Sequence, residues 1–384
     1  MSRRPTALIA LAGLLAAALL GLPRLLLDGE ATVPGTEAVR NVLRERADNA
    51  GFDRVTGPRT LAFPQDHGAH PGYRHEWWYV TGHLRSPGHS DRGFQLTFFR
   101  YGLVPGQPSS TSRWRSHQWV LAHFAVSDPG TGKFHHEARQ SRAALELAGF
   151  TEPDARLWLD DWQLARDATD DNWTLSARTT DASLRLRLTP TKPLVLQGDR
   201  GYSAKSSEPG NASHYYSLPR LLGRGQLRVE GEVQDVEAEA WLDHEWGTSG
   251  LGATQAGWDW FALQLQDGRE LTFYRLRGRD GGTDSHSRGL LVRADGGAEP
   301  LGHDAVRLRP LRWWTSPTSG LRYPVAWEVE LPAESLALRL EPLFDAQEWA
   351  RGLRYWEGAV RVHDVASGAT LGQGYLELTG YGPP

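Results

Sequence analysis

Two segments from the first half of the chain return in the second half at almost the same spacing, and this constrains the fold more than any other feature. The tripeptide His-Glu-Trp at 75–77 returns at 244–246, which is 169 residues later. The segment QLTFFR at 95–100 returns as ELTFYR at 270–275, which is 175 residues later. Such a period indicates one structural unit that occurs twice. The 384 residues are enough for two domains of ordinary size.

Most of the chain after residue 60 alternates between apolar and polar residues, as antiparallel strands do. In the segment 183–188, three leucines fall on one face and two arginines on the other. We expect further strands at 79–84, 94–101, 118–126, 157–159, 173–175, 226–231, 236–241, 260–266, 271–276, 290–293, 325–331, 336–340, 356–362 and 375–379. Many short strands separated by turns indicate barrels or sandwiches, and a barrel of about eight strands encloses one small ligand. The predicted fold is all-β, with two antiparallel β-barrels in tandem.

The first 28 residues have the pattern of an export signal. Arg3 and Arg4 precede an apolar or glycine run at 7–22, and Leu25–Leu27 extend it beyond Pro23. We expect a cleaved signal peptide or a membrane anchor. The folded part is then periplasmic or secreted, or held at the cytoplasmic membrane by this segment.

The remaining chain divides into three regions by composition. Residues 29–60 form a linker with a short helix, because Val39, Val42 and Leu43 share one helical face. An N-terminal barrel follows at 61–220 and a C-terminal barrel at 221–384. We place the junction near 218–225, where proline and glycine interrupt the strand pattern.

Composition and missing motifs exclude several functions. A net charge of -4 without a basic cluster argues against a nucleic-acid partner. The absence of cysteine excludes disulfides and thiolate metal sites. The chain has no nucleophile elbow, no phosphate-binding loop and no dinucleotide fingerprint. We predict no cofactor and no metal, although His67, His70 and His75 offer an alternative set of imidazole ligands without a recognised spacing.

The segment 75–79 is the first candidate site. On an extended strand His75, Trp77 and Tyr79 face one side, and Glu76 and Trp78 face the other. Tryptophan supplies a large apolar surface with one N–H donor, and the chain has sixteen of them. The segment therefore either lines a ligand cavity or forms a hydrogen-bonded brace at the closed end of a barrel.

The segment 243–246 is the second candidate site. Asp243 and Glu245 share one strand face, and His244 and Trp246 share the other. These residue types suit proton transfer beside an aromatic wall.

Asp259 lies between Trp258 and Trp260 in the sequence. If this carboxyl is buried there, desolvation raises its pKa and keeps it protonated, as a general acid requires. Alternatively, Asp259 is a turn residue before a strand. Tyr215 and Tyr216, near the predicted junction, line a pocket mouth or pack the interface between the domains.

The motifs HEWWYVTGHL, HYYS, WLDHEWG, GWDWFALQLQDG and GYLELTGY, in this order, resemble the AttH and carotenoid 1,2-hydratase family of lipocalin-like proteins. The resemblance runs from about Leu61 to the C-terminus. It implies two lipocalin-like barrels in tandem. It also implies addition of water to an isolated double bond, with His244, Trp246 and Asp259 as catalytic residues.

We therefore predict a binding site for a hydrophobic isoprenoid or lipid and a hydro-lyase reaction by acid catalysis. The alternative is a lipid-binding protein of the cell envelope, or an accessory to a transporter, without catalytic activity. Asp243 and Glu245 are further catalytic candidates. The predicted ligand-binding residues are His75, Glu76, Trp77, Trp78, Tyr79, Tyr215, Tyr216, Trp258 and Trp260.

Overall fold

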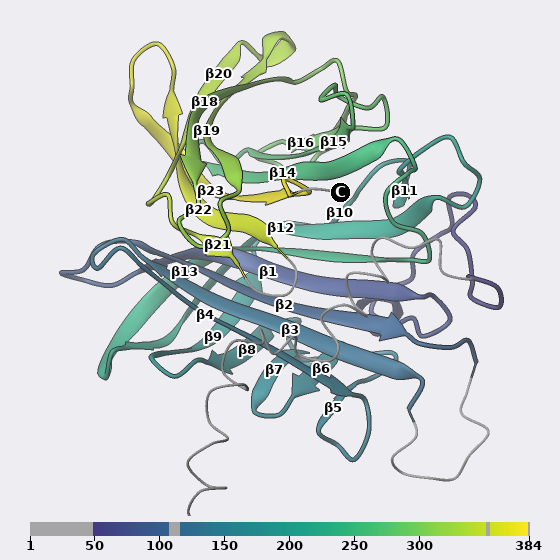
Figure 1. Cartoon of the computed structure of the whole chain (residues 1–384). Coiled ribbons are helices and arrows are strands. Elements are labelled where there is room, and N and C mark those ends of the chain that lie inside the picture. Colours follow the sequence, from purple (N-terminus) through teal and green to yellow (C-terminus); the bar gives the residue numbers. More distant parts are fainter. Residues whose placement is uncertain (1–48, 107–115, 351–353, 383–384) are drawn as a thin grey trace, which may run out of the picture.

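The computed structural model of the protein describes residues 49–106, 116–350 and 354–382. This part of the chain folds into two antiparallel sheets that curl into barrel-like shapes and lie against each other (Figure 1). Its only helical elements are two short 3-10 turns, η1 (Gln65–His67) and η2 (Pro332–Glu334). The predicted all-β fold is confirmed. The predicted leader at 1–28 and the short helix of the linker lie outside the described residues.

The first sheet has thirteen strands in the order β4-β3-β2-β1-β13-β12-β9-β8-β7-β6-β5, and β10 and β11 pair with β12. Its strands are β1 (His75–Arg85), β2 (Arg92–Gly102), β3 (Gln118–Asp128), β4 (Lys133–Arg142), β5 (Ala148–Phe150), β6 (Arg156–Leu159), β7 (Trp162–Arg166), β8 (Trp173–Arg178), β9 (Ala182–Pro190), β10 (Val195–Leu196), β11 (Tyr202–Ala204), β12 (Ala212–Val229) and β13 (Glu232–Gly247).

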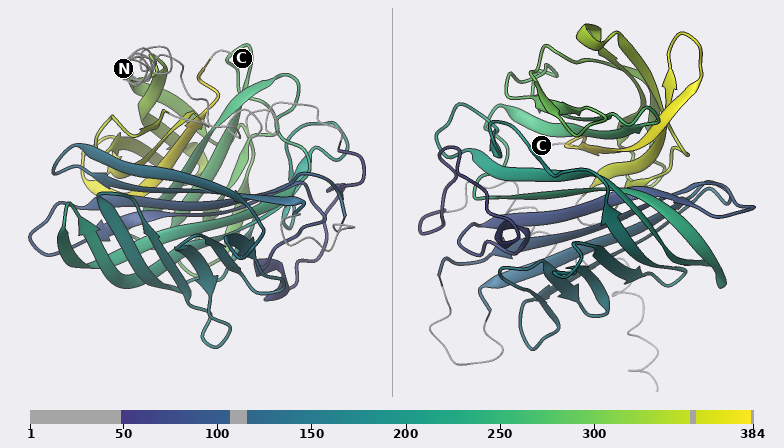
Figure 2. Two further views of the ribbon diagram at one scale, coloured as in Figure 1. Left: turned by 60° about the horizontal axis from the view of Figure 1, so that its bottom comes forward. Right: turned by 180° about the vertical axis from the view of Figure 1, so that it is seen from behind.

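The second sheet has ten strands in the order β17-β16-β15-β14-β23-β22-β20-β19-β18, and β21 pairs with β22. Its strands are β14 (Gln255–Leu265), β15 (Glu270–Gly278), β16 (Arg288–Val292), β17 (Ala298–Leu301), β18 (Arg307–Thr315), β19 (Arg322–Leu331), β20 (Leu336–Pro342), β21 (Glu348–Trp349), β22 (Tyr355–Asp364) and β23 (Thr370–Thr379). Figure 2 shows the two sheets as separate layers from two further directions.

Every predicted strand overlaps an observed strand, but several observed strands are longer, above all β12 and β13. The alternation predicted at 183–188 is present in β9, where Leu184, Leu186 and Leu188 are buried in the first core. Glu230 and Gly231 instead form the turn between β12 and β13, and both have positive φ. A turn of this kind favours glycine, which has no Cβ to clash.

The boundary between the sheets lies later than the junction expected near 218–225. β12 and β13 pair with each other along most of their length, and β13 also pairs with β1. Residues 221–247, expected in the second barrel, are therefore hydrogen-bonded into the first sheet. The second sheet begins at Gln255.

Each central strand has one face in a barrel core and one face in a layer between the sheets. Trp78, Val80 and Leu84 of β1 belong to the first core, whereas Tyr79 belongs to a cluster shared with the second sheet. The sheets approach closely, because a Cβ added at Gly93 of β2 would lie 2.4 Å from the Cβ of Ala359. Within residues 49–106, 116–350 and 354–382, no helix has the length and hydropathy needed to cross a membrane.

Candidate functional site

Strand alternation divides the predicted site residues among three places. The inner side of the first sheet carries Glu76, Trp78, Tyr216, His244 and Trp246. The layer between the sheets carries His75, Trp77, Tyr79, Tyr215, Asp243, Glu245, Trp258 and Trp260. The interior of the second barrel contains Asp259.

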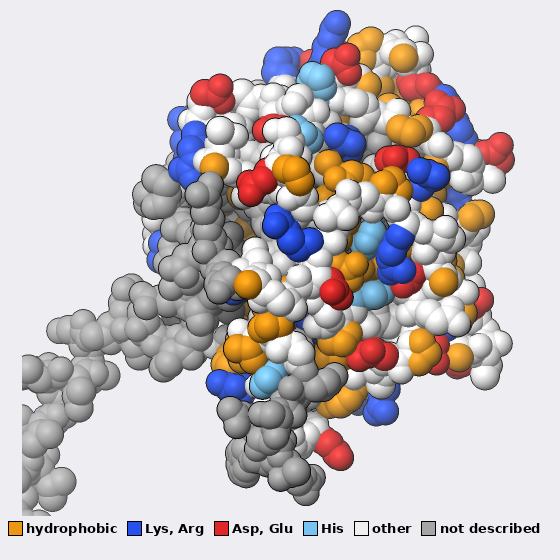
Figure 3. Space-filling model, turned by 90° about the vertical axis from the view of Figure 1, so that its right-hand side faces the viewer, with side chains coloured by type: hydrophobic (Ala, Val, Ile, Leu, Met, Phe, Trp, Pro, Cys, Tyr) orange, Lys and Arg blue, Asp and Glu red, His pale blue; other side chains and the backbone are white. Residues whose placement is uncertain are grey.

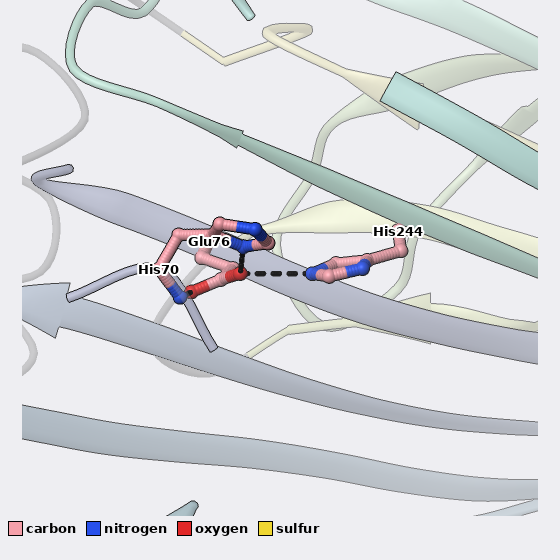
Figure 4. A group of neighbouring side chains, drawn as sticks. All are labelled: His70, Glu76 and His244. Atoms are coloured by element: carbon pink, nitrogen blue, oxygen red, sulfur yellow. Dashed lines mark hydrogen bonds and ion pairs between the residues drawn. The ribbon is translucent and has the colours of Figure 1, made fainter. Parts of the chain in front are cut away.

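Glu76 is the centre of the group on the inner side of the first sheet (Figure 4). Its side chain is 0% exposed. The Nδ1 of His70 and the Nε2 of His244 donate to its Oε1 at 2.7 and 2.8 Å. The Nε of Arg100 and the backbone N–H of His70 donate to its Oε2 at 2.7 and 2.9 Å. Each oxygen of this buried carboxylate therefore accepts two hydrogen bonds, which is the full capacity of a carboxylate.

Strand register explains how distant residues meet at this carboxylate. On β1 and β13, Glu76 lies opposite Trp246, and Trp78 lies opposite His244. Glu76 and His244 are thus diagonal neighbours on one face, within reach of a long side chain. Arg100 lies directly opposite Glu76 on β2, the strand on the other side of β1.

The charges of this network follow from its contacts. Burial opposes ionisation of Glu76, but Arg100 and His70 outweigh it and hold the pKa of Glu76 well below its usual range. Burial likewise opposes a charge on His70, yet Glu76 and the hydrogen bond to Asp66 raise the pKa of His70. The second nitrogen of His70, Nε2, donates to Asp66 Oδ1 at 2.9 Å. His70 is therefore an imidazolium held between two carboxylates.

His244 continues the network inward as a neutral imidazole. Burial lowers the pKa of His244 to about 4. Because its Nε2 donates to Glu76, its Nδ1 is an acceptor, and the Tyr216 hydroxyl donates to it at 3.2 Å. The Nδ1 of His67 donates to the same hydroxyl at 2.7 Å. A continuous hydrogen-bonded chain thus runs from His70, whose side chain is 14% exposed, to buried His67.

Aromatic rings hold the two histidines of the network in place. The His70 ring stacks on Trp246 with centroids 3.9 Å apart, and the His244 ring stacks on Trp78 at 4.4 Å. The Arg59 guanidinium lies over the Trp246 ring, 5.6 Å from its centroid. Trp246 thus has cationic groups in contact with it, as expected for an indole face that attracts positive charge.

The donor atoms of His70, Glu76 and His244 lie within 4.8 Å of one another, a spacing that can hold a metal ion. An ion there would replace the two hydrogen bonds to Glu76 Oε1. The alternative metal set of His67, His70 and His75 is not assembled. His75 lies on the other face of β1, stacks on Trp77, and has its pKa lowered to about 3 by burial.

In the layer between the sheets, Asp243 accepts hydrogen bonds from Ser217, Tyr215 and Trp241 at 2.5, 2.6 and 2.6 Å. Burial raises the pKa of Asp243 to about 7. Glu245, on the same face, lies 2.8 Å from the ammonium of Lys205. These two carboxyls face away from His244, as predicted from alternation.

Asp259 is buried within β14 and is not the turn residue of the alternative interpretation, and burial raises its pKa, as expected for a buried carboxyl. However, its partners are Arg275 at 2.9 Å, Arg277 at 3.8 Å and the Tyr381 hydroxyl at 2.8 Å. None of these residues contacts the Glu76 network. The trio of His244, Trp246 and Asp259 that the family resemblance implied is therefore split between the two barrels.

The predictions from the sequence missed two residues of the Glu76 network and gave a third another role. His70 was considered only as a metal ligand, and Asp66 and Arg100 were not candidates. Arg100 did carry a signal, since it ends one copy of the repeated segment and Arg275 ends the other. The loop that brings Asp66 and His70 over β1 has no periodic pattern that would predict its position.

A cavity of about 540 Å³ lies beside the network at the same end of the first sheet. Pro71, which follows His70, lines it together with Phe150 and Trp158. Gln118 also lines it and accepts a hydrogen bond from Arg100 at 2.8 Å. Figure 3 views this end of the molecule, where hydrophobic, basic and histidine side chains share the surface.

Comparisons with known proteins agree with this architecture. A solved AttH protein of Nitrosomonas europaea is 37% identical, with a TM-score of 0.78, over 86% of this chain and 100% of its own. The solved kievitone hydratase of Nectria haematococca is 13% identical, with a TM-score of 0.62, over 86% and 98% of the two chains, and this likeness shows the shared fold.

A dehydratase of Emericella nidulans is 25% identical over 162 residues, a match that spans 39% of this chain and 43% of that protein. The model of the family described as AttH-like matches residues 54–381. The chain therefore belongs to the AttH-like family.

Proposed function

We propose that the protein is a hydro-lyase that adds water to, or removes it from, an apolar isoprenoid or lipid substrate, with His70 as its acid. The observation that carries this proposal is the chain Asp66–His70–Glu76–His244, which holds a charged imidazole at the edge of an aromatic, buried site. Relatives named as a hydratase and a dehydratase support the reaction class.

In the hydration direction, His70 transfers its Nε2 proton to one carbon of an isolated double bond. The resulting carbocation lies beside Trp246, whose π-system attracts positive charge. A water molecule adds to the cation, and its surplus proton passes to Asp66 and back to His70. One water is consumed, one alcohol forms, and the imidazolium is restored.

Glu76 and His244 act on His70 rather than on the substrate. Glu76 fixes the Nδ1–H of His70 and stabilises its charge, while His244 fixes the carboxylate of Glu76. Because His244 is neutral, it does not cancel the attraction between Glu76 and His70. We assign both as positioning residues.

The surroundings of His70 fit an apolar substrate. The Trp246 cluster includes the partly exposed Phe63, Tyr73, Leu194 and Leu196. The adjacent cavity of about 540 Å³ falls in the usual range of small-molecule sites, about 300–1,000 Å³. We propose that the substrate chain lies in this cavity, and that the protein works outside the cytoplasm because of its N-terminal segment.

The test is turnover of lycopene-type and other isoprenoid alkenes in water enriched in heavy oxygen. We expect label in the product, and a loss of about 10²–10⁴-fold in His70→Gln, as for removal of a general acid. His244→Gln should lower kcat and leave KM nearly unchanged. A chelator added to the wild-type assay reports any dependence on a metal at His70, Glu76 and His244.

The second candidate function is an envelope lipid-binding protein or transporter accessory without catalysis. The observation that favours it is the complete hydrogen bonding of Glu76, which also suits a rigid brace. Native mass spectrometry of protein purified from its own membrane fraction would then show a retained apolar ligand. Retention by wild type and His70→Gln alike, with no label incorporated from any alkene, would reject the hydro-lyase proposal.

A further inference from the structure

The layer between the sheets contains more acidic groups than basic ones. Asp243, Glu245, Glu357 and Glu377 face this layer. In the part of the chain that the structure describes, the only cation paired with any of them is Lys205, whose Nζ lies 2.8 Å from Glu245. Lys205 also lies over the Tyr274 ring, 4.5 Å from its centroid. The layer thus already holds one ammonium between a carboxylate and an aromatic ring.

Glu357 and Glu377 lie directly opposite each other on β22 and β23. Trp258 donates its indole N–H to Glu377 Oε1 at 3.1 Å. The Glu357 side chain is 1% exposed, and neither of its carboxyl oxygens accepts a well-aligned hydrogen bond among the described residues, although the hydroxyls of Tyr79 and Tyr355 interact with it. Buried acceptors in this state are rare in native proteins.

Two tyrosines lie beside Glu357. The hydroxyls of Tyr79 and Tyr375 are buried without a well-aligned hydrogen bond within the described residues. Glu357 raises the pKa of both, after burial, so both hydroxyls lie within its field. Burial also raises the pKa of Glu377 to about 8, because no cation offsets it.

Burial without a nearby cation favours the protonated form of Glu357 and Glu377, so a bound cation that donates several hydrogen bonds would ionise both. Carboxylate oxygens accept only, and a tyrosine oxygen accepts as well as donates. A primary ammonium has three N–H donors and suits such a set better than a quaternary ammonium, which has none. Neighbouring indole and phenol faces attract the same charge.

The layer is reachable from one end of the sheets. Trp77 and Trp258 are partly exposed and pack against the cluster that contains Tyr79 and Trp260, and Glu377 is also partly exposed. Their strand ends lie at the end of the molecule that faces the viewer in Figure 3. An alkyl or aryl group can therefore lie along these indoles while its ammonium points toward Glu377.

We propose that the layer between β1, β14, β22 and β23 binds the primary ammonium of an apolar amine, with Glu377 and Glu357 as its carboxylate partners and Trp77 and Trp258 along its apolar part. This site is separate from the Glu76 network, because Tyr79 and Trp77 point to the opposite face of β1 from Glu76. It does not depend on the hydro-lyase proposal.

The test compares n-hexylamine with n-hexanol, which has the same chain and no charge, by calorimetric titration of the full chain. We expect saturable one-to-one binding of the amine, at least 10-fold tighter than that of the alcohol. Glu377→Gln and Glu357→Gln should each weaken amine binding at least 10-fold and leave the alcohol unaffected. Glu237→Gln is the matched control, because Glu237 is exposed on β13.

Equal affinity for amine and alcohol, or no saturable binding of the amine, would overturn the proposal. So would amine binding that Glu377→Gln and Glu237→Gln change equally. If a glutamine variant fails to fold, Trp258→Phe replaces it, because it removes the indole N–H that fixes Glu377 and keeps an aromatic ring. Hydration of alkenes is measured separately, so its loss or retention bears only on the Glu76 network.

Discussion

The carboxylate of Glu76 lies 2.7 Å from the guanidinium of Arg100 on the neighbouring strand, and both side chains are at most 1% exposed. Breaking a buried pair of this kind leaves a charge in a medium that cannot solvate it. The pair also anchors the loop above it, because Arg100 Nη2 donates to the backbone carbonyls of His70 and Tyr73.

Replacement of Arg100 by methionine should therefore destabilise the protein strongly. We expect a loss of about 3–5 kcal/mol in the free energy of unfolding, because Glu76 stays buried without its cation. Urea unfolding followed by tryptophan fluorescence measures this. Arg187→Met is the control, since Arg187 is half-exposed and pairs with exposed acids, and an equal loss there would contradict the prediction.

Five buried histidines should each lower the free energy of unfolding in mild acid. Burial lowers the pKa of His67, His75 and His123 to about 3, and those of His83 and His244 to about 4. Between these folded pKa values and about pH 6.5, each of these histidines binds a proton in the unfolded chain but not in the native protein. Its contribution to the free energy of unfolding is present above about pH 6.5, the pKa of a histidine in the unfolded chain. That contribution is lost as the pH falls toward the pKa of the same histidine in the folded protein.

His70 affects stability in the opposite direction, because its pKa is raised in the folded protein. Its contribution to the free energy of unfolding is lost as the pH increases through its pKa in the folded protein. Asp243 and Glu377, whose pKa values burial raises to about 7 and about 8, release protons on unfolding in the same pH range and oppose the histidines. The measurement is therefore the difference between wild type and His123→Gln in urea unfolding at pH 7.5 and 5. We expect His123→Gln to take up about one proton fewer than wild type on unfolding at pH 5. Equal pH dependence of the two proteins would show that His123 is charged in the native protein.

Asp259→Asn should leave turnover close to wild type, because Asp259 lies in the second barrel and contacts no member of the Glu76 network. It should still lower stability by about 2–5 kcal/mol, since Arg275 and Arg277 lose their buried counter-charge. Steady-state kinetics and urea unfolding of one preparation separate the two effects. A drop in turnover comparable with that of His70→Gln would show that Asp259 takes part in catalysis.

Gly93→Ala should weaken the contact between the sheets. The added methyl group would lie 2.4 Å from the Cβ of Ala359, which is too close for either sheet to keep its place. Overpacking of this kind costs about 1–3 kcal/mol. Gly57→Ala is the matched control, because a Cβ there meets nothing within 4 Å. Similar melting temperatures for the two variants would show that the interface adapts without cost.

The strand pattern and the alternation of faces were predictable from the sequence, because both depend on local periodicity. Alternation separated Glu76 from His75 and His244 from Asp243, as the structure confirms. Strand neighbours were not predictable in the same way. The pairing of β1 with β13 depends on the whole sheet, so the meeting of Glu76 with His244 had no local signal.

The two repeated segments show this limit clearly. The copies at 95–100 and 270–275 occupy the second strand of each sheet in equivalent places. Arg100 lies opposite Glu76, and Arg275 lies opposite Asp259. Each copy of the segment therefore ends in an arginine that pairs with an acid on the neighbouring strand. The copies at 75–77 and 244–246 are instead neighbouring antiparallel strands of one sheet. Their likeness therefore did not mark equivalent positions in two barrels.

β13 carries His244 and Trp246 toward one compartment and Asp243 and Glu245 toward another, at successive positions along a single backbone. An insertion or deletion of one residue in this strand would exchange the two sets and damage both compartments at once. The residues that β13 contributes to either compartment can therefore change only by substitution at fixed positions. If the ligand of one compartment changes, β13 cannot shift along the sheet to fit it without also displacing the residues of the other compartment.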